Sequence, residues 1–173
     1  MVSVILTVYA RPENLDLQLK HINNQSIKPD EIIIVVDFNA DINFNFEKYQ
    51  DYKVVSFNQN MGVWARFSIA LLSKSKYVCV FDDDTIPGKK WFENCIKTLD
   101  KVDGLLGTVG IKFKSGALDY SYSDRVGWPS ANDKIEQVDI VGHSWFFKRE
   151  LIEKFWNNTS DHHKYKKSGE DMH

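Results

Sequence analysis

Three consecutive carboxylates, Asp82-Asp83-Asp84, follow the apolar run 77–81 (YVCVF) and precede a Pro-Gly turn. A short run rich in valine and aromatic residues is typical of a buried central strand. Neighbouring carboxylates repel each other and are costly to desolvate unless a cation lies among them. Because strand side chains alternate, we expect Asp82 and Asp84 on one face and Asp83 on the other. The pattern indicates a site for Mg²⁺ or Mn²⁺ at a strand end; the alternative is a solvated acidic turn after an edge strand.

Strands and helices are expected to alternate along the rest of the chain. Short apolar runs predict strands at 2–8, 31–36, 53–57 and 77–81, and regular patterning is also seen at 105–111, 136–141 and 142–147. Apolar residues at helical spacing predict helices at 13–24, 63–73, 91–99 and 149–156, and the stretch 114–134 is expected to be a long irregular connection. The first strand, helix and strand form a βαβ unit, which implies parallel pairing. We therefore predict an α/β fold: a single Rossmann-like domain with a central mixed, mostly parallel sheet flanked by helices.

Composition excludes several classes of protein. At 173 residues and 43% hydrophobic content, the chain can bury one good core. A formal net charge of −2 gives no electrostatic support for nucleic-acid binding. Cys79 and Cys95 fall in an expected strand and helix, where they are predicted to be free core residues in a reducing compartment. Since no apolar run is long enough to span a membrane, we expect a cytoplasmic protein, or one held at the cytosolic face of a membrane by parts outside this chain.

Several motifs occur in a fixed order along the chain. They are Thr7-Val8-Tyr9 before Arg11 and Pro12, a second strand ending in Asp37, the segment Asn58-x-Asn60-x-Gly62-x-x-Ala65-Arg66, the acidic triplet, Val141-Gly142 before Phe146-Phe147, and Gly169-Glu170-Asp171. In this order they resemble the nucleotide-sugar-dependent glycosyltransferases of the type A (GT-A) fold, especially the family 2-like group. The resemblance implies one catalytic domain over 1–173, with a nucleotide-binding half (1–111) and an acceptor-side half (112–173).

The resemblance assigns residues to the donor nucleotide. Its base and ribose are expected against the ends of the first two strands, and its phosphates near the third motif; the residues concerned are Thr7, Tyr9, Arg11, Asp37, Asn60 and Arg66. Asp37 can accept hydrogen bonds from sugar hydroxyls or a base N–H, and Arg11 can stack or reach phosphate. The alternative for Arg66 is an arginine on a helix surface. Asp83 is expected to contact the donor sugar or to support the metal site.

The resemblance also implies a metal and a catalytic base. Asp84 would bind Mn²⁺ or Mg²⁺ directly, with Asp82 near the ribose or a metal-bound water and His173 as a further ligand. The cation would bridge the two phosphates and stabilise the charge that grows on the diphosphate. Asp171 matches the base of inverting members, with Glu170 as the competing candidate; the alternative is merely a charged tail.

The acceptor side is less well defined. His143 and Trp145 fall where the family forms the floor between the donor and acceptor sugars. Trp145 can serve as an aromatic platform for a sugar or as a core residue. His162 and His163, with His173, could suggest zinc, but no regular ligand spacing supports it. Members of the family continue past the base motif, so the chain is expected to be a truncated core, a compact variant or one piece of a larger protein.

Other activities fit the motifs less well. A haloacid-dehalogenase-type phosphohydrolase places its acidic motif after the first strand, whereas here it follows the fourth. A nucleotidyltransferase of related fold needs a glycine-rich loop after the first strand, and the segment 9–12 contains no glycine. An inactive sugar-nucleotide-binding domain remains open. We predict transfer of a sugar from a nucleoside-diphosphate sugar, by preference a UDP-sugar, to a carbohydrate or other hydroxyl acceptor, with Asp171 as the base of an inverting reaction.

Overall fold

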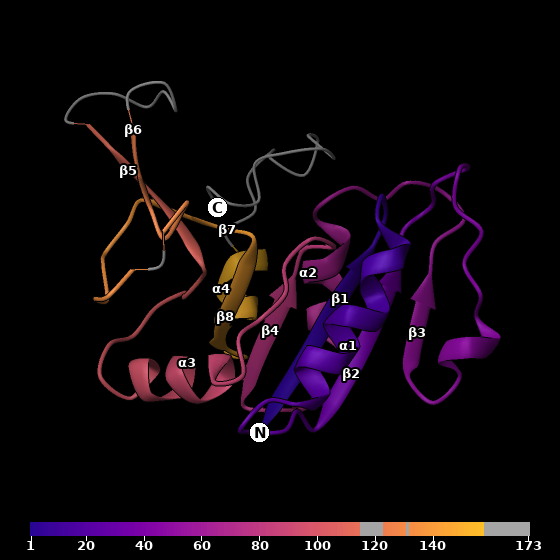
Figure 1. Ribbon diagram of the computed structural model, residues 1–173, viewed down its shortest axis with the longest axis horizontal. Coiled ribbons are helices and arrows are strands. Elements are labelled where there is room, and N and C mark those ends of the chain that lie inside the picture. Colours follow the sequence, from indigo (N-terminus) through magenta and orange to yellow (C-terminus); the bar gives the residue numbers. More distant parts are fainter. Residues whose placement is uncertain (115–122, 131, 158–173) are drawn as a thin grey trace.

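A five-stranded mixed sheet forms the centre of the computed structural model, which describes residues 1–114, 123–130 and 132–157 (Figure 1). The strand order is β3-β2-β1-β4-β8. The first four strands in this order are parallel and the last runs antiparallel to β4. This confirms the predicted α/β fold with a mostly parallel sheet. The strands are β1 (Val2–Val8), β2 (Glu31–Val36), β3 (Lys53–Ser56), β4 (Tyr77–Phe81) and β8 (Ser144–Lys148).

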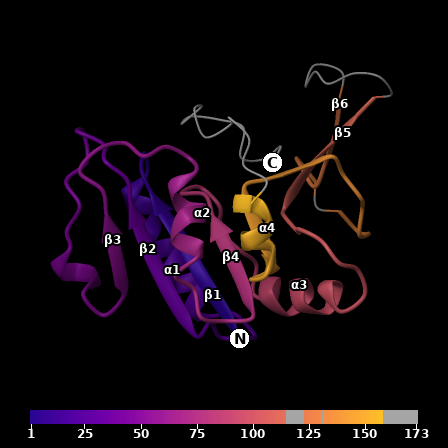
Figure 2. The same ribbon diagram turned by 180° about the vertical axis from the view of Figure 1, so that it is seen from behind.

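Helices cover both faces of this sheet, as Figures 1 and 2 show from opposite sides. On one face, α1 (Leu15–Asn23) and α3 (Trp91–Leu99) pack against alternate residues of β1, β2 and β4. On the other face, α2 (Ala65–Ala70) and α4 (Leu151–Asn157) pack against the intervening residues. The alternation follows from the two-residue period of a strand, which sends successive side chains to opposite faces.

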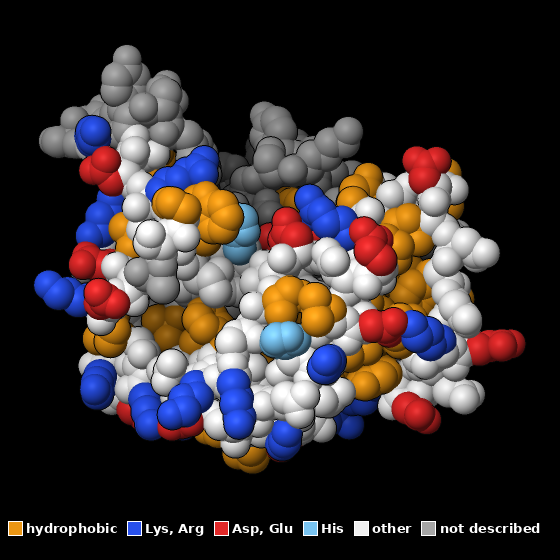
Figure 3. All heavy atoms as spheres, in the orientation of Figure 1, with side chains coloured by type: hydrophobic (Ala, Val, Ile, Leu, Met, Phe, Trp, Pro, Cys, Tyr) orange, Lys and Arg blue, Asp and Glu red, His pale blue; other side chains and the backbone are white. Residues whose placement is uncertain are grey.

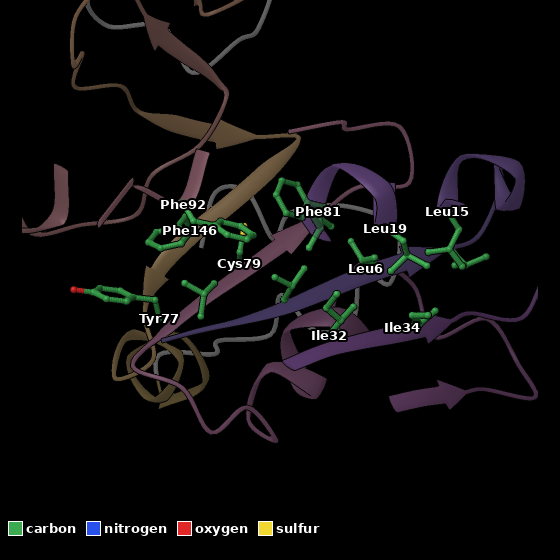
Figure 4. Packing of buried hydrophobic residues seen from close by; sticks show 14 of the residues in the cluster. Leu6, Leu15, Leu19, Ile32, Ile34, Tyr77, Cys79, Phe81, Phe92 and Phe146 are labelled. Carbon is green, nitrogen blue, oxygen red and sulfur yellow. The ribbon is translucent and has the colours of Figure 1, made fainter. Parts of the chain in front are cut away.

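The larger core lies beneath α1 and α3 (Figure 4). Leu15, Leu19 and Ile22 of α1 come from one helix face, as their spacing of four and three residues predicts. Phe92 of α3 and Phe146 of β8 complete the core beside β4. Full burial of such a side chain contributes about 1.5–3 kcal/mol. The central strands are therefore held firmly, which fixes the positions of their carboxyl ends.

A smaller antiparallel sheet lies beside the central one (Figure 1) and has the order β6-β5-β7. Its strands are β5 (Val109–Phe113), β6 (Ser123–Val126) and β7 (Ile140–Gly142). Here the expectation was partly wrong: β6 lies in the stretch 114–134, which was predicted to be an irregular connection. The regular patterns at 105–111 and 136–141 only partly coincide with β5 and β7. β6 has the polar sequence SDRV, so its pairing with β5 defines it rather than its own apolar pattern.

The remaining observations concern the helices of the described residues. Short 3-10 helices occur at η1 (Pro12–Asn14) and η2 (Glu47–Tyr49). The helix predicted at 63–73 is shorter than expected because its last turns tighten: Leu71 N and Leu72 N donate to carbonyls three residues earlier. Among the helices that the structure describes, none has the length and apolar character needed to cross a membrane.

The two cysteines are free and buried, as predicted. Cys79 lies on β4 and Cys95 on α3, both in the larger core. Burial raises the pKa of the Cys95 thiol to about 12. The thiol is therefore protonated at neutral pH and packs as a small apolar side chain.

Candidate functional site

A cavity of about 460 Å³ opens at the carboxyl ends of β1, β2 and β4. It brings together predicted site residues from five separate segments: Thr7, Tyr9, Arg11, Asp37, Asn60, Arg66, Asp82, Asp83, Asp84 and His143. Gly62 and Ala65, named from sequence only as members of the third motif, also line it, and sequence reasoning did not single out the remaining three residues, Ala10, Val35 and Val63. Figure 3 shows acidic and basic side chains next to one another at this edge of the sheet. The predicted Glu170, Asp171 and His173 lie outside the described residues.

The acidic triplet belongs to a turn, Asp82–Thr85, that we call the acid turn. β4 ends at Phe81, and the N–H of Thr85 donates to the carbonyl of Asp82 at 3.2 Å. Because the strand has ended, its two-residue alternation ends as well. The expectation that Asp83 faces away from Asp84 was therefore wrong: all three residues line the same cavity, and the Asp83 and Asp84 carboxylates lie against the same Arg11 nitrogen.

Side chains of α1 and of the residue before it hold the acid turn. Gln18 is 1% exposed, and its Nε2 donates to the carbonyls of Asp82 at 2.7 Å and Thr85 at 3.0 Å. Asn14 Nδ2 donates to the carbonyl of Asp83 at 2.9 Å. Sequence reasoning missed Gln18, although a signal was present: it is a polar residue on the apolar face of α1, between Leu15 and Ile22.

Arg66 neutralises Asp82 inside the protein. It is 7% exposed, and its Nη1 donates to Asp82 Oδ1 in an ion pair. The guanidinium carbon lies 4.4 Å from the ring centroid of Trp145, within the range of a cation–π contact. Burial raises the pKa of Asp82, and the Arg66 charge opposes that rise. Of the two readings of Arg66, a site residue and a surface arginine, the structure shows a buried residue that lines the cavity.

Trp145 does not line the cavity. It is 2% exposed, its Nε1 donates to the carbonyl of Val141 at 3.0 Å, and its ring packs edge to face against Phe67. Of the two readings of Trp145, the structure places it in the core beneath Arg66. Its ring supports the guanidinium and has no face open to a sugar.

Arg11 lies against the other two carboxylates. Asp83 accepts hydrogen bonds from the N–H groups of Ala10 at 2.9 Å and Arg11 at 3.1 Å, and from Arg11 Nη1 at 2.6 Å. The same Nη1 lies 3.4 Å from Asp84 Oδ2. The loop that follows β1 is thereby attached to the acid turn by both backbone and side chain.

Asp37 fixes the opposite wall of the cavity. Its Oδ1 accepts from the N–H groups of Phe38 and Met61, both at 2.9 Å, and its Oδ2 accepts from Gly62 N at 3.2 Å. Gly62 has φ 73°, a left-handed conformation that glycine adopts without strain. Asn60 Oδ1 also accepts from Gly62 N, at 2.9 Å. Asp37 thus holds the loop that carries Asn60, in addition to presenting its carboxylate to the cavity.

His143 joins the smaller sheet to the acid turn. It lies between β7 and β8 with φ 66°, an uncommon conformation for a residue with a side chain. Its carbonyl accepts from Asp82 N at 3.2 Å and from Thr85 Oγ1 at 2.7 Å. On the other side of the turn, Thr7 Oγ1 donates to the carbonyl of Phe81 at 3.0 Å. The residue predicted for the donor–acceptor floor therefore contacts the predicted metal motif.

The carboxylates suit a cation shared with a ligand better than a cation held by protein alone. Within residues 1–114, 123–130 and 132–157 there is no cluster of three or more side chains able to ligate a metal. Mg²⁺ commonly needs only one or two carboxylates, with phosphate oxygens and waters completing its shell. Asp84 meets this requirement because its carboxylate is 41% exposed and lines the cavity, with Asp82 nearby.

The role of Gln18 can be tested with Gln18→Met, which keeps the length of the side chain and removes its amide. The half-buried carbonyls of Asp82 and Thr85 would each lose the hydrogen bond from this amide, so we expect the free energy of unfolding to fall by about 1–3 kcal/mol. Urea denaturation measures this change. Lys20→Met on the exposed face of the same helix is the matched control and should have little effect. Equal stability of the two variants would contradict the assigned role.

Comparison with solved structures finds TarS of S. aureus. Its structure aligns with a TM-score of 0.63 and 17% identity, covering 99% of this chain and 32% of TarS. TarS 1–349 in complex with UDP aligns with a TM-score of 0.61 and 18% identity, covering 99% of this chain and 52% of that structure. TarS 1–349 in complex with UDP-GlcNAc aligns with a TM-score of 0.56 and 17% identity, covering 88% of this chain and 46% of that structure. At this identity the likeness shows a shared fold, and the chain spans about half of the shorter TarS structures and a third of the longer one.

Sequence comparisons give two further results. No curated protein sequence matches the chain. The sequence model of glycosyl transferase family 2 matches residues 3–156, which include every helix and strand of the described fold except the ends of β1 and α4. The matched region contains the acid turn, Asp37 and Arg66, so the resemblance drawn from the ordered motifs is confirmed. The chain belongs to glycosyl transferase family 2.

Proposed function

We propose that this chain transfers a sugar from a nucleoside-diphosphate sugar, a UDP-sugar by preference, to a hydroxyl group of an acceptor. The observation that carries the proposal is the cavity at the carboxyl ends of β1, β2 and β4, where carboxylates and arginines lie side by side. Ligands of open α/β sheets bind at this edge, and the volume suits a small-molecule ligand. A sugar nucleotide needs both kinds of group, because its diphosphate is anionic and its usual partner is a divalent cation.

The donor would lie between the two walls of the cavity. Tyr9 is exposed and offers a ring face to a base, while Asp37 has lone pairs free to accept from ribose or base in addition to its backbone bonds. Arg66 is held in place by Asp82 and Trp145, ready to face a phosphate. The complexes of TarS with UDP and UDP-GlcNAc support the choice of uridine.

A divalent cation fits this arrangement. Asp84 would hold Mn²⁺ or Mg²⁺, with Asp82 close by, and His173 remains a candidate third ligand. Once bound, the cation would supply positive charge to the diphosphate as the bond to the sugar breaks. Arg66 would stabilise the same charge from the other side of Asp82, and Asp83 would keep the loop after β1 against the acid turn.

Transfer also needs a base on the acceptor side. In an inverting reaction the acceptor oxygen bonds to the anomeric carbon from the side opposite to the leaving diphosphate, and the hydroxyl proton goes to a carboxylate. We propose Asp171 for this role, with Glu170 as the alternative, on the strength of the Gly169-Glu170-Asp171 motif. The acceptor is a carbohydrate or another hydroxyl compound, which His143 would face from the junction of β7 and β8.

The metal assignment is tested by Asp84→Asn, measured by calorimetric titration of UDP with Mn²⁺ and with EDTA. The parent should bind UDP more tightly with Mn²⁺, and the variant should lose about tenfold or more of that gain, because a carboxylate ligand is removed. Asp100→Asn, at the end of α3, is the matched control and should behave as the parent. If Asp84→Asn bound UDP with the parent's metal dependence, Asp84 would not be the ligand.

The base assignment is tested by Asp171→Asn, measured as the rate of UDP release from UDP-GlcNAc with water as the acceptor. We expect the rate to fall by about 10²–10⁴-fold, since a positioned base contributes that much, while UDP affinity stays unchanged. Asp161→Asn in the same part of the sequence is the control. Release at the parent's rate in Asp171→Asn would overturn the assignment. UDP binding by the parent without release from UDP-GlcNAc or any other UDP-sugar would instead favour an inactive sugar-nucleotide-binding domain.

A further inference from the structure

We propose that Arg11 is a positioning residue that makes metal binding depend on the donor nucleotide. Before the donor arrives, its guanidinium neutralises Asp83 and Asp84; once the donor is bound, it pairs with the diphosphate and leaves Asp84 to the cation. The inference rests on the proposed function and goes beyond it, because it assigns an order to the binding of two ligands. It is carried by the contacts of Arg11 with the acid turn.

The guanidinium occupies the position that a cation at Asp84 would need. Arg11 Nη1 lies 2.6 Å from Asp83 Oδ1 and 3.4 Å from Asp84 Oδ2, so one nitrogen lies between two carboxylates. A divalent ion bound to Asp84 would stand about 2 Å from a carboxylate oxygen. Its charge would then repel the guanidinium at close range. The two cations therefore compete for the same side of the acid turn.

Arg11 is the more exposed of the two arginines that line this cavity. Half of its side chain is exposed (49%), whereas Arg66 is buried against the ring of Trp145. A guanidinium is charged at neutral pH, with or without its carboxylate partners. A guanidinium pairs as well with phosphate as with carboxylate, which gives it a second partner in the same cavity.

Release of the guanidinium would not disturb the acid turn. Asp83 keeps two backbone donors, Ala10 N and Arg11 N, when the Arg11 side chain leaves. The carbonyl of Asp83 stays bonded to Asn14 Nδ2. Asp84, by contrast, loses its cationic neighbour and exposes a carboxylate to the cavity. The movement thus creates a metal ligand without reorganising the backbone.

This exchange has a thermodynamic consequence. If the nucleotide draws Arg11 away from Asp84, it raises the affinity for the cation, and the cation must raise the affinity for the nucleotide by the same factor. Without nucleotide, the cation has to displace Arg11 and binds weakly. Arg11 therefore favours loading of the metal together with the donor over loading of the metal alone.

The test is a titration of Mn²⁺, followed by the electron paramagnetic resonance of the free ion, with and without UDP. Parent protein, Arg11→Gln and Arg125→Gln are compared. Arg125 is an exposed arginine of β6 that does not line the cavity, so its variant controls for the loss of one positive charge. In Arg11→Gln we expect Mn²⁺ affinity without UDP to rise about thirtyfold, as removal of one unit charge near 4 Å from a divalent ion in water predicts. The increase in Mn²⁺ affinity caused by UDP should shrink.

The outcomes separate this inference from the proposed function. If the parent binds UDP and Mn²⁺ together, the proposed donor site is supported. The Mn²⁺ affinity of Arg11→Gln then decides whether Arg11 has the proposed role. Unchanged or weaker Mn²⁺ binding by Arg11→Gln without UDP, or a rise of the same size in Arg125→Gln, would overturn the role. A parent that binds neither ligand would overturn both proposals. Equal midpoint temperatures of thermal unfolding in the three proteins would show that the exposed substitutions leave the fold intact.

Discussion

The neutralisation of three adjacent carboxylates at the end of β4 is the constraint on which the rest of the site depends. Their charges would repel one another, and burial makes the charged form of Asp82 more costly still. The fold meets this cost with two arginines, Arg66 from α2 and Arg11 from the loop after β1. Gln18 of α1 holds the backbone of the turn. Both arginines also line the cavity.

The scaffold makes that convergence possible. Parallel strands end at the same edge of a sheet, so the residues following β1, β2 and β4 meet there although they lie far apart in the sequence. Two apolar layers, one on each face, keep these ends in register. The antiparallel β8 begins at the same edge, which places the residue before it, His143, against the acid turn. A precise site thus follows from ordinary core packing.

The parts that could be predicted from sequence are those with strong local patterns. The apolar runs of β1, β2 and β4 and the spacing of Leu15, Leu19 and Ile22 were enough for the central fold, and the ordered motifs were enough for most of the cavity. Three points escaped prediction for physical reasons. Asp83 turned toward the cavity because β4 ends before it, β6 is defined by its partner strand, and the role of Gln18 depends on carbonyls distant in sequence. The roles of Asp171, Glu170 and His173 stay predictions, as does the division into two halves.

The most direct measurement of the central claim is a crystal structure of this chain with UDP and Mn²⁺, with the metal located by its anomalous scattering. The account predicts one Mn²⁺ bonded to Asp84 and to the diphosphate, the uracil near Tyr9 and Asp37, and the Arg11 guanidinium turned from Asp84 toward a phosphate oxygen. UDP bound away from the carboxyl ends of β1, β2 and β4, or a metal that does not contact the acid turn, would contradict it.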